Sequence, residues 1–173
     1  MKIEFIPLLI SLIPSLFITL LALFYFKKHT DNEDKRRRYL LHKEHQKQSL
    51  PLRLQAYERM ALFLERISPG KLLLRTPPIG DDKKSYESLL VHTIEQEFDH
   101  NLTQQIYISN ECWNIVKAAK NGTIVLIRKT VLKDSIDSAS KLREAILTEM
   151  VEKGAPSDDA LTAIKSEVED LFS

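Results

Sequence analysis

Apolar residues are distributed in two ways along this chain: one unbroken run near the N-terminus, then stretches in which they recur every three or four positions. The run extends from Phe5 to Phe26 and contains no charged side chain. A helix of this length extends about 33 Å, and the hydrocarbon core of a bilayer is about 30 Å thick. The run therefore predicts a transmembrane helix.

A cleaved secretory signal is the alternative explanation of this run. Such signals have a basic start, an apolar stretch of about 7–15 residues and a small-residue cleavage site. Here Lys2 is accompanied by Glu4, and the longer run ends in Phe-Tyr-Phe-Lys-Lys. We expect a retained anchor. Pro14 lies in mid-span and predicts a kink, which is either simply tolerated in the membrane or packs on a partner span.

The periodic stretches that follow all predict helices. The strongest covers 51–67, where two adjacent faces are apolar at helical spacing. One face holds Leu54, Tyr57, Ala61 and Leu64, and the other holds Ala56, Met60, Phe63 and Ile67. Ser49-Leu50-Pro51 predicts a break before this helix and Ser68-Pro69-Gly70 its end. Residues 71–80, with two prolines and a glycine, predict a loop.

Five further segments complete the expected bundle. A helix over 85–100 places Tyr86, Leu90, Ile94 and Phe98 on one side, and a second helix starts at a cap formed by Asn110. Residues 122–131 are rich in β-branched side chains, but a lone strand would leave its backbone unsatisfied, so we expect helix there. Helices over 134–153 and from Pro156 onward follow, the last with a stripe formed by Leu161, Ile164, Val168 and Leu171.

These elements predict an all-α protein in three parts. Residues 1–28 form a transmembrane anchor, 29–50 a basic helical stalk, and 51–173 a helical bundle domain. The final stripe and the Leu54, Tyr57 and Leu64 face are expected to pack inside the bundle or to contact a partner protein.

Charge is balanced overall, with a net +1, but it is unevenly distributed. Residues 27–59 hold ten Lys and Arg against five acids, whereas 134–173 hold ten acids against four bases. The bases next to the apolar run are Lys27, Lys28, Lys35, Arg36, Arg37 and Arg38. Positive flanks stay on the cytoplasmic side of a membrane. We therefore expect the N-terminus outside the membrane and the bundle in the cytoplasm, a reducing compartment that suits the single Cys112.

Candidate chemistry is sparse. His42 and His45 are three residues apart, and a second group, His92, Glu95, Asp99 and His100, shares a helix, but neither is matched by a second ligand pair elsewhere. Cys112 lies at a helix start, where it is expected to be a buried small residue rather than a nucleophile. No phosphate-binding glycine loop or nucleophile motif occurs. We expect no catalytic residue, no metal, no cofactor, no small-molecule substrate, and hence no enzyme.

Two functions remain open. The first is a non-enzymatic accessory or scaffold protein whose bundle binds a protein partner or self-associates. The second is a binder of anionic lipid or nucleic acid through residues 27–38, with nucleic acid less favoured because the distal half is acidic.

The stretches LPLRLQAYERMALFLERISP (50–69) and EFDHNLTQQIYIS (97–109) resemble an uncharacterised family of membrane-anchored helical proteins from Bacteroidota. The resemblance extends over most of the chain. It implies a bacterial inner-membrane protein with a single N-terminal span, a basic flank and a cytoplasm-facing helical domain, and it supplies no catalytic residues.

Overall fold

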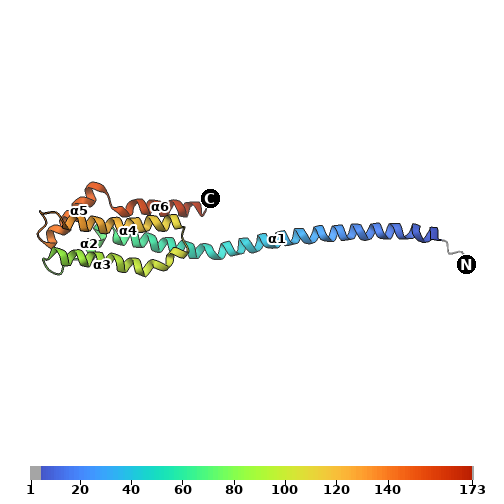
Figure 1. The fold of residues 1–173 in the computed structure, drawn as a ribbon, viewed down its shortest axis with the longest axis horizontal. Helices are drawn as coiled ribbons and strands as arrows, with labels where there is room; N and C mark the ends of the chain where they lie inside the picture. Colours follow the sequence, from blue (N-terminus) through green and yellow to red (C-terminus); the bar gives the residue numbers. More distant parts are fainter. Residues whose placement is uncertain (1–4, 173) are drawn as a thin grey trace. The chain divides into compact units, whose positions relative to one another are not determined.

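The structure, a computed structural model, describes residues 5–172; the side chains of residues 5–13, 31, 32, 42 and 45–47 lie outside this description. Every regular element between residues 5 and 172 is a helix (Figure 1), which confirms the predicted all-α class. The elements are α1 (Phe5–Ile67), α2 (Pro69–Arg75), α3 (Lys83–Asn101), the 3-10 helix η1 (Leu102–Ile106), α4 (Asn110–Val131), α5 (Ala139–Lys153) and α6 (Pro156–Asp170).

The chain forms two compact units, Met1–Ser49 and Leu50–Ser173, here called the N-terminal unit and the bundle. The described side chains of the N-terminal unit are nearly all exposed on α1. Within the described residues, no helix combines the length and the apolar character needed to cross a bilayer. The predicted span Phe5–Phe26 includes residues 5–13, whose side chains lie outside the description, so the span stays a prediction.

Helix α1 runs without interruption through Pro51, so the predicted break at residues 49–51 is wrong. A proline inside a helix removes one hydrogen bond, the one to the carbonyl four residues earlier, and kinks or breaks the helix unless its neighbours hold it. Here the next turn already packs into the bundle, where Ala56 and Tyr57 are buried. Burial of this turn outweighs the loss of one backbone hydrogen bond.

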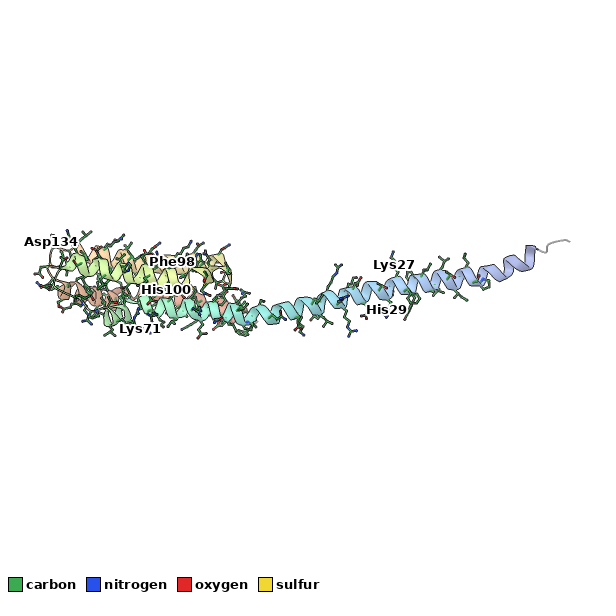
Figure 2. All side chains as sticks on the ribbon, turned by 90° about the horizontal axis from the view of Figure 1, so that it is seen from below. Lys27, His29, Lys71, Phe98, His100 and Asp134 are labelled. Atoms are coloured by element: carbon green, nitrogen blue, oxygen red, sulfur yellow. The ribbon has the colours of Figure 1, made fainter. Side chains whose placement is uncertain are left out.

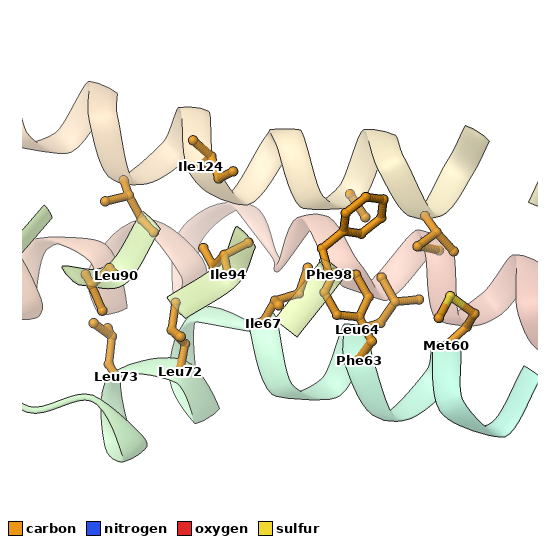
Figure 3. Close-up of a cluster of buried hydrophobic side chains, with 14 of the residues drawn as sticks. Met60, Phe63, Leu64, Ile67, Leu72, Leu73, Leu90, Ile94, Phe98 and Ile124 are labelled. Atoms are coloured by element: carbon orange, nitrogen blue, oxygen red, sulfur yellow. The ribbon is translucent and has the colours of Figure 1, made fainter. Parts of the chain in front are cut away.

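The bundle surrounds one apolar core, to which α1 to α6 all contribute. Figure 3 shows Met60, Phe63, Leu64 and Ile67 of α1 pointing toward Leu90, Ile94 and Phe98 of α3, with Ile124 of α4 on the opposite side. The helical spacing of these residues places them on inner faces. Both predicted faces of the 51–67 helix are buried or half-buried, and the four residues predicted on one side of α3 are its buried residues.

Aromatic side chains fill one region of the core. The ring of Phe98 lies 5.7 Å from that of Phe63 and 5.2 Å from that of Trp113, measured between centroids. The ammonium group of Lys120 lies 4.7 Å from the centre of the Phe98 ring and 2.8 Å from a carboxylate oxygen of Glu95. This aromatic row joins α1, α3 and α4 through offset and tilted contacts, the arrangements that aromatic pairs favour.

Helix boundaries differ from the predicted ones in three places. The sequence predicts a helix end followed by a loop at residues 69–75. These residues form α2 instead, because Leu72 and Leu73 bury apolar surface in the core. Ser109, not Asn110, caps α4 through its hydroxyl oxygen, which accepts from the Cys112 N–H at 3.0 Å. Helix α5 starts at Ala139 rather than at residue 134. The helical assignment of residues 122–131 is confirmed within α4.

Helices α4 and α6 approach closely along small residues. Ala119 of α4 and Ala160 of α6 are buried. A β-carbon added at Gly122 would lie 3.1 Å from the Cβ of Pro156. The missing side chain at Gly122 thus allows the start of α6 to lie against the middle of α4, since only the smallest residue leaves that space.

Candidate interaction surfaces

The carboxylate of Glu167 on α6 accepts hydrogen bonds from two other parts of the bundle. It accepts from the Tyr57 hydroxyl at 2.6 Å, from the Ser109 hydroxyl at 2.9 Å and from the Ser109 N–H at 3.2 Å. Arg53 adds a second layer by donating to the Tyr57 hydroxyl and to the carbonyl of Tyr107, both at 3.3 Å. The carboxylate therefore ties α6 to α1 and to the start of α4.

Burial raises the pKa of Glu167, but hydrogen bonds from Tyr57, Ser109 and Cys112 outweigh it, and the net pKa is lowered. Burial and the neighbouring Glu167 raise the pKa of the Cys112 thiol to about 12. A thiol with that pKa stays protonated at neutral pH and is a poor nucleophile. The predicted buried role of Cys112 is confirmed, since 2 % of its surface is exposed.

A groove of about 420 Å³ opens beside this cluster, between α4 and α6. Its lining includes the carboxylates of Glu111, Glu167 and Asp170 and the side chains of Ile115 and Ala163. The oxygens of Glu167 at this groove accept hydrogen bonds from Tyr57 and Ser109, so the cluster holds α6 to α1 and to the start of α4.

The end of the bundle at the α2–α3 and α4–α5 connections is a second surface, here called the loop end and defined as residues 74–82 and 132–138 (Figure 1). Backbone and side-chain bonds join the two connections. The Lys83 ammonium donates to the carbonyls of Val131 at 3.1 Å and Ile136 at 2.5 Å, and the Ala139 N–H donates to the Asp81 carbonyl at 2.9 Å. A cation at the carbonyl end of α4 also suits the helix dipole.

The loop end exposes large apolar side chains. The exposed fractions are 75 % for Leu74, 92 % for Ile79 and 80 % for Leu132. Tyr86 anchors this end from inside, with its hydroxyl donating to the carbonyl of Thr76 at 2.8 Å. The connections are thus held in place while their apolar side chains face outward, which is a feature of protein interaction sites.

The third surface is the basic segment, residues 27–38 of the N-terminal unit. Its described side chains are exposed, and Figure 2 shows Lys27 standing out from the helix. Arg36 lies 3.7 Å from Glu33, and both side chains are mostly exposed, so this ion pair is weak.

The predicted contact residues lie inside the bundle. Tyr57, Leu64 and Ile164 are buried in the core, Leu54 is half-buried, and the remaining members of the α6 stripe, Leu161, Val168 and Leu171, are partly buried against the core. In this structure all of them pack, and none is presented as a free apolar face.

The histidine and carboxylate groups considered from the sequence do not assemble into a site in the described part of the chain. His42 and His45 have side chains outside the description. On α3, His92, Asp99 and His100 are exposed, whereas Glu95 pairs with Lys120. Among the described residues, no three His, Cys, Asp or Glu side chains come close enough to hold a metal ion.

The chain is thus all-helical between residues 5 and 172, and its bundle exposes apolar side chains at the loop end. It belongs to the family of unknown function DUF7935, whose model matches residues 3–171, nearly the whole chain. No curated protein and no solved structure matched it.

Proposed function

We propose that this protein is a non-enzymatic, membrane-anchored accessory or scaffold protein whose bundle binds a partner protein or a second copy of itself. In this proposal residues 5–26 cross a bacterial inner membrane, with the N-terminus outside and the bundle in the cytoplasm, as implied by the resemblance to membrane-anchored proteins of Bacteroidota. Support for the anchor comes from the uncharged apolar run and the six bases that follow it.

The observation that carries the binding role is the exposure of Leu74, Ile79 and Leu132 at the loop end. The connections that bear them are fixed by Lys83, Tyr86 and the Asp81–Ala139 hydrogen bond, so little conformational entropy is lost when a partner binds. An aliphatic side chain that enters a pocket of the partner can serve as the central anchor of a protein interface.

Site-specific photo-crosslinking in native membranes tests the binding role. A photoreactive phenylalanine analogue at Ile79 or Leu132 is expected to form a discrete crosslinked species with one protein or with a second copy of the chain. The matched control is Ile106 of η1, which is 72 % exposed and lies at the opposite end of the bundle. Crosslinks of equal yield from all three positions, or none from any, contradict the proposal.

Two exposed-site variants then test the same surface by loss of binding. The double variant Ile79→Asp with Leu132→Asp is expected not to co-purify, after mild detergent extraction, with the partner that crosslinking identifies. Ile106→Asp is expected to co-purify with it. Since both changes are at exposed side chains, the fold is expected to survive, as circular dichroism of the purified full chain would show.

The anchor is tested separately. Washing membranes with alkaline carbonate is expected to leave the protein in the pellet, and protease added outside intact cells is expected to leave the bundle uncut. Release by carbonate or external cleavage of the bundle contradicts the anchored topology without bearing on the loop end.

A further inference from the structure

The basic segment contains four consecutive bases, Lys35 to Arg38, on a helix whose side chains there are exposed. Successive residues of an α-helix are rotated by about 100°, so four of them point to all sides of the helix axis. Whatever the rotation of the helix, at least one of these bases faces any surface beside it. The Arg36–Glu33 pair neutralises little of this charge, because both partners are exposed to solvent.

The position of these bases relative to the proposed span gives them a partner. Lys35 to Arg38 follow Phe26 by nine to twelve residues, which is about 13–18 Å along a helix. The headgroup layer adds roughly 5–8 Å to each side of the hydrocarbon core, and electrostatic attraction extends about 8–10 Å further at physiological salt. The four bases therefore lie within the electrostatic reach of the headgroups.

We propose that Lys35 to Arg38 bind the phosphate groups of anionic lipids in the membrane that the proposed span crosses. This inference rests on the anchored topology. The guanidinium groups of Arg36, Arg37 and Arg38 stay charged at any physiological pH, so headgroups with a net negative charge attract them more than zwitterionic ones, in which a choline cation lies beside the phosphate. A phosphate polymer fits less well, because residues 134–173 carry ten acids against four bases and repel it.

Spin labelling of the full chain tests this contact. The buried Cys112 leaves a cysteine introduced at the exposed Tyr39 as the reactive thiol for the label. Tyr39→Cys protein is reconstituted into nanodiscs of phosphatidylcholine alone or of phosphatidylcholine mixed with phosphatidylglycerol. We expect slower label motion in the anionic discs, and loss of that difference at high salt, where the Debye length falls to about 3 Å at 1 M.

Two triple variants distinguish an effect of the basic segment from an effect of the net charge of the chain. Arg36→Gln with Arg37→Gln and Arg38→Gln is expected to abolish the lipid dependence of label motion. Lys84→Gln with Lys129→Gln and Lys165→Gln removes the same charge from exposed positions of the bundle and is expected to retain it. Equal label motion in both lipids, or the same loss in both variants, overturns the proposal.

Additional arms identify the source of the phosphate. Slowing by inorganic phosphate or by an oligonucleotide in phosphatidylcholine discs, without slowing by phosphatidylglycerol, assigns the bases to a soluble anion and overturns the lipid contact. If carbonate extracts the protein, the anchored topology is wrong, and flotation with phosphatidylglycerol vesicles tests the lipid contact instead. Flotation of the parent chain that is lost in the arginine variant then still supports lipid binding. Absence of flotation overturns it.

Discussion

Tyr57 donates a hydrogen bond from its hydroxyl to the Glu167 carboxylate, 2.6 Å from Oη to Oε1, across 110 residues of sequence. Tyr57 belongs to the part of α1 that enters the bundle, and Glu167 belongs to the last helix. The contact closes the bundle between its first and last helices, and Ser109 adds the start of α4 to the same carboxylate.

Replacing Tyr57 with Phe removes the hydroxyl and leaves the ring. Because the lost hydrogen bond is made to a charged, partly buried carboxylate, we expect the free energy of unfolding to fall by about 1–3 kcal/mol. Urea denaturation of the full chain in mild detergent measures this difference. Tyr39→Phe is the matched control, since Tyr39 is 67 % exposed. If Tyr39→Phe lowered the free energy of unfolding by more than Tyr57→Phe does, the hydrogen bond to Glu167 would not be the source of the effect.

Stability is expected to decrease in acid. The pKa of Glu149 is lowered from 4.5 to about 2 by Lys133 and then Lys153, and that of Glu97 is lowered chiefly by Arg66. A carboxylate with a lowered folded pKa stabilises the fold above its unfolded pKa, and this contribution is lost as pH falls through the folded pKa. The urea midpoint should therefore fall between about pH 4.5 and pH 2.

Glu149→Gln tests the source of that acid dependence. The glutamine has no proton to gain in this range, so the decrease in urea midpoint between about pH 4.5 and pH 2 should become shallower than in the parent chain. Glu169→Gln, at an exposed position of α6, is the matched control and is expected to leave the profile unchanged. If the Glu149 variant has the same pH profile as the parent chain, the lysine partners of Glu149 do not account for the acid dependence of stability.

Cys112 should resist alkylation in the folded chain. Its pKa of about 12 and its burial keep the thiol protonated and covered at pH 8. Mass spectrometry after maleimide treatment is expected to show no adduct without denaturant and one adduct in concentrated urea. A cysteine placed at the exposed Tyr39 should react in both conditions, and rapid native modification of Cys112 would show that α6 leaves α4 readily.

Gly122 and Gly154 should respond to alanine for different reasons. At Gly122 a new Cβ meets Pro156 at 3.1 Å, while helix propensity improves by about 0.5–1 kcal/mol, so the two effects offset each other. Gly122→Val exceeds the available space and should cost about 1–3 kcal/mol. At Gly154, φ is +79° and ψ is 168°, a conformation that essentially only glycine adopts, so alanine should cost about 1–3 kcal/mol despite the open space around it.

Thermal unfolding followed by circular dichroism distinguishes these three variants. Gly122→Ala should melt nearest to the melting temperature of the parent chain, and both Gly154→Ala and Gly122→Val should melt at lower temperatures than Gly122→Ala. If Gly122→Val melts with the parent, the α4–α6 approach is looser than the structure describes.

Local apolar spacing was enough to predict the inner faces of the helices. The four inward residues of α3 and the two adjacent faces of the 51–67 segment follow directly from the 3.6-residue period. Residues 122–131 were assigned correctly despite their β-branched side chains, because a strand there would have lacked a partner. Helical periodicity depends only on neighbours in sequence, so one sequence suffices to read it.

Features that depend on tertiary contacts were not predicted. The role of Glu167 requires Tyr57 and Ser109 to come together across the bundle, and nothing in the sequence around this half-buried acid distinguishes it from the exposed acids of α6. Helix α2 was missed because Pro69 and Gly70, its first two residues, were interpreted as a helix end, whereas the burial of Leu72 and Leu73 decides its structure. The loop end had one usable signal: Ile79 lies in a segment rich in turn residues, where an apolar side chain has no core to enter.

The proline inside α1 affects how the chain responds to heat. Pro51 has no amide hydrogen to give the carbonyl of residue 47, so the ladder of backbone hydrogen bonds has a gap beside the junction of the two units. Cooperative melting spreads along a helix through that ladder. Deuterium uptake should therefore change abruptly at this position, with slow exchange from residue 54 onward and faster exchange before residue 50.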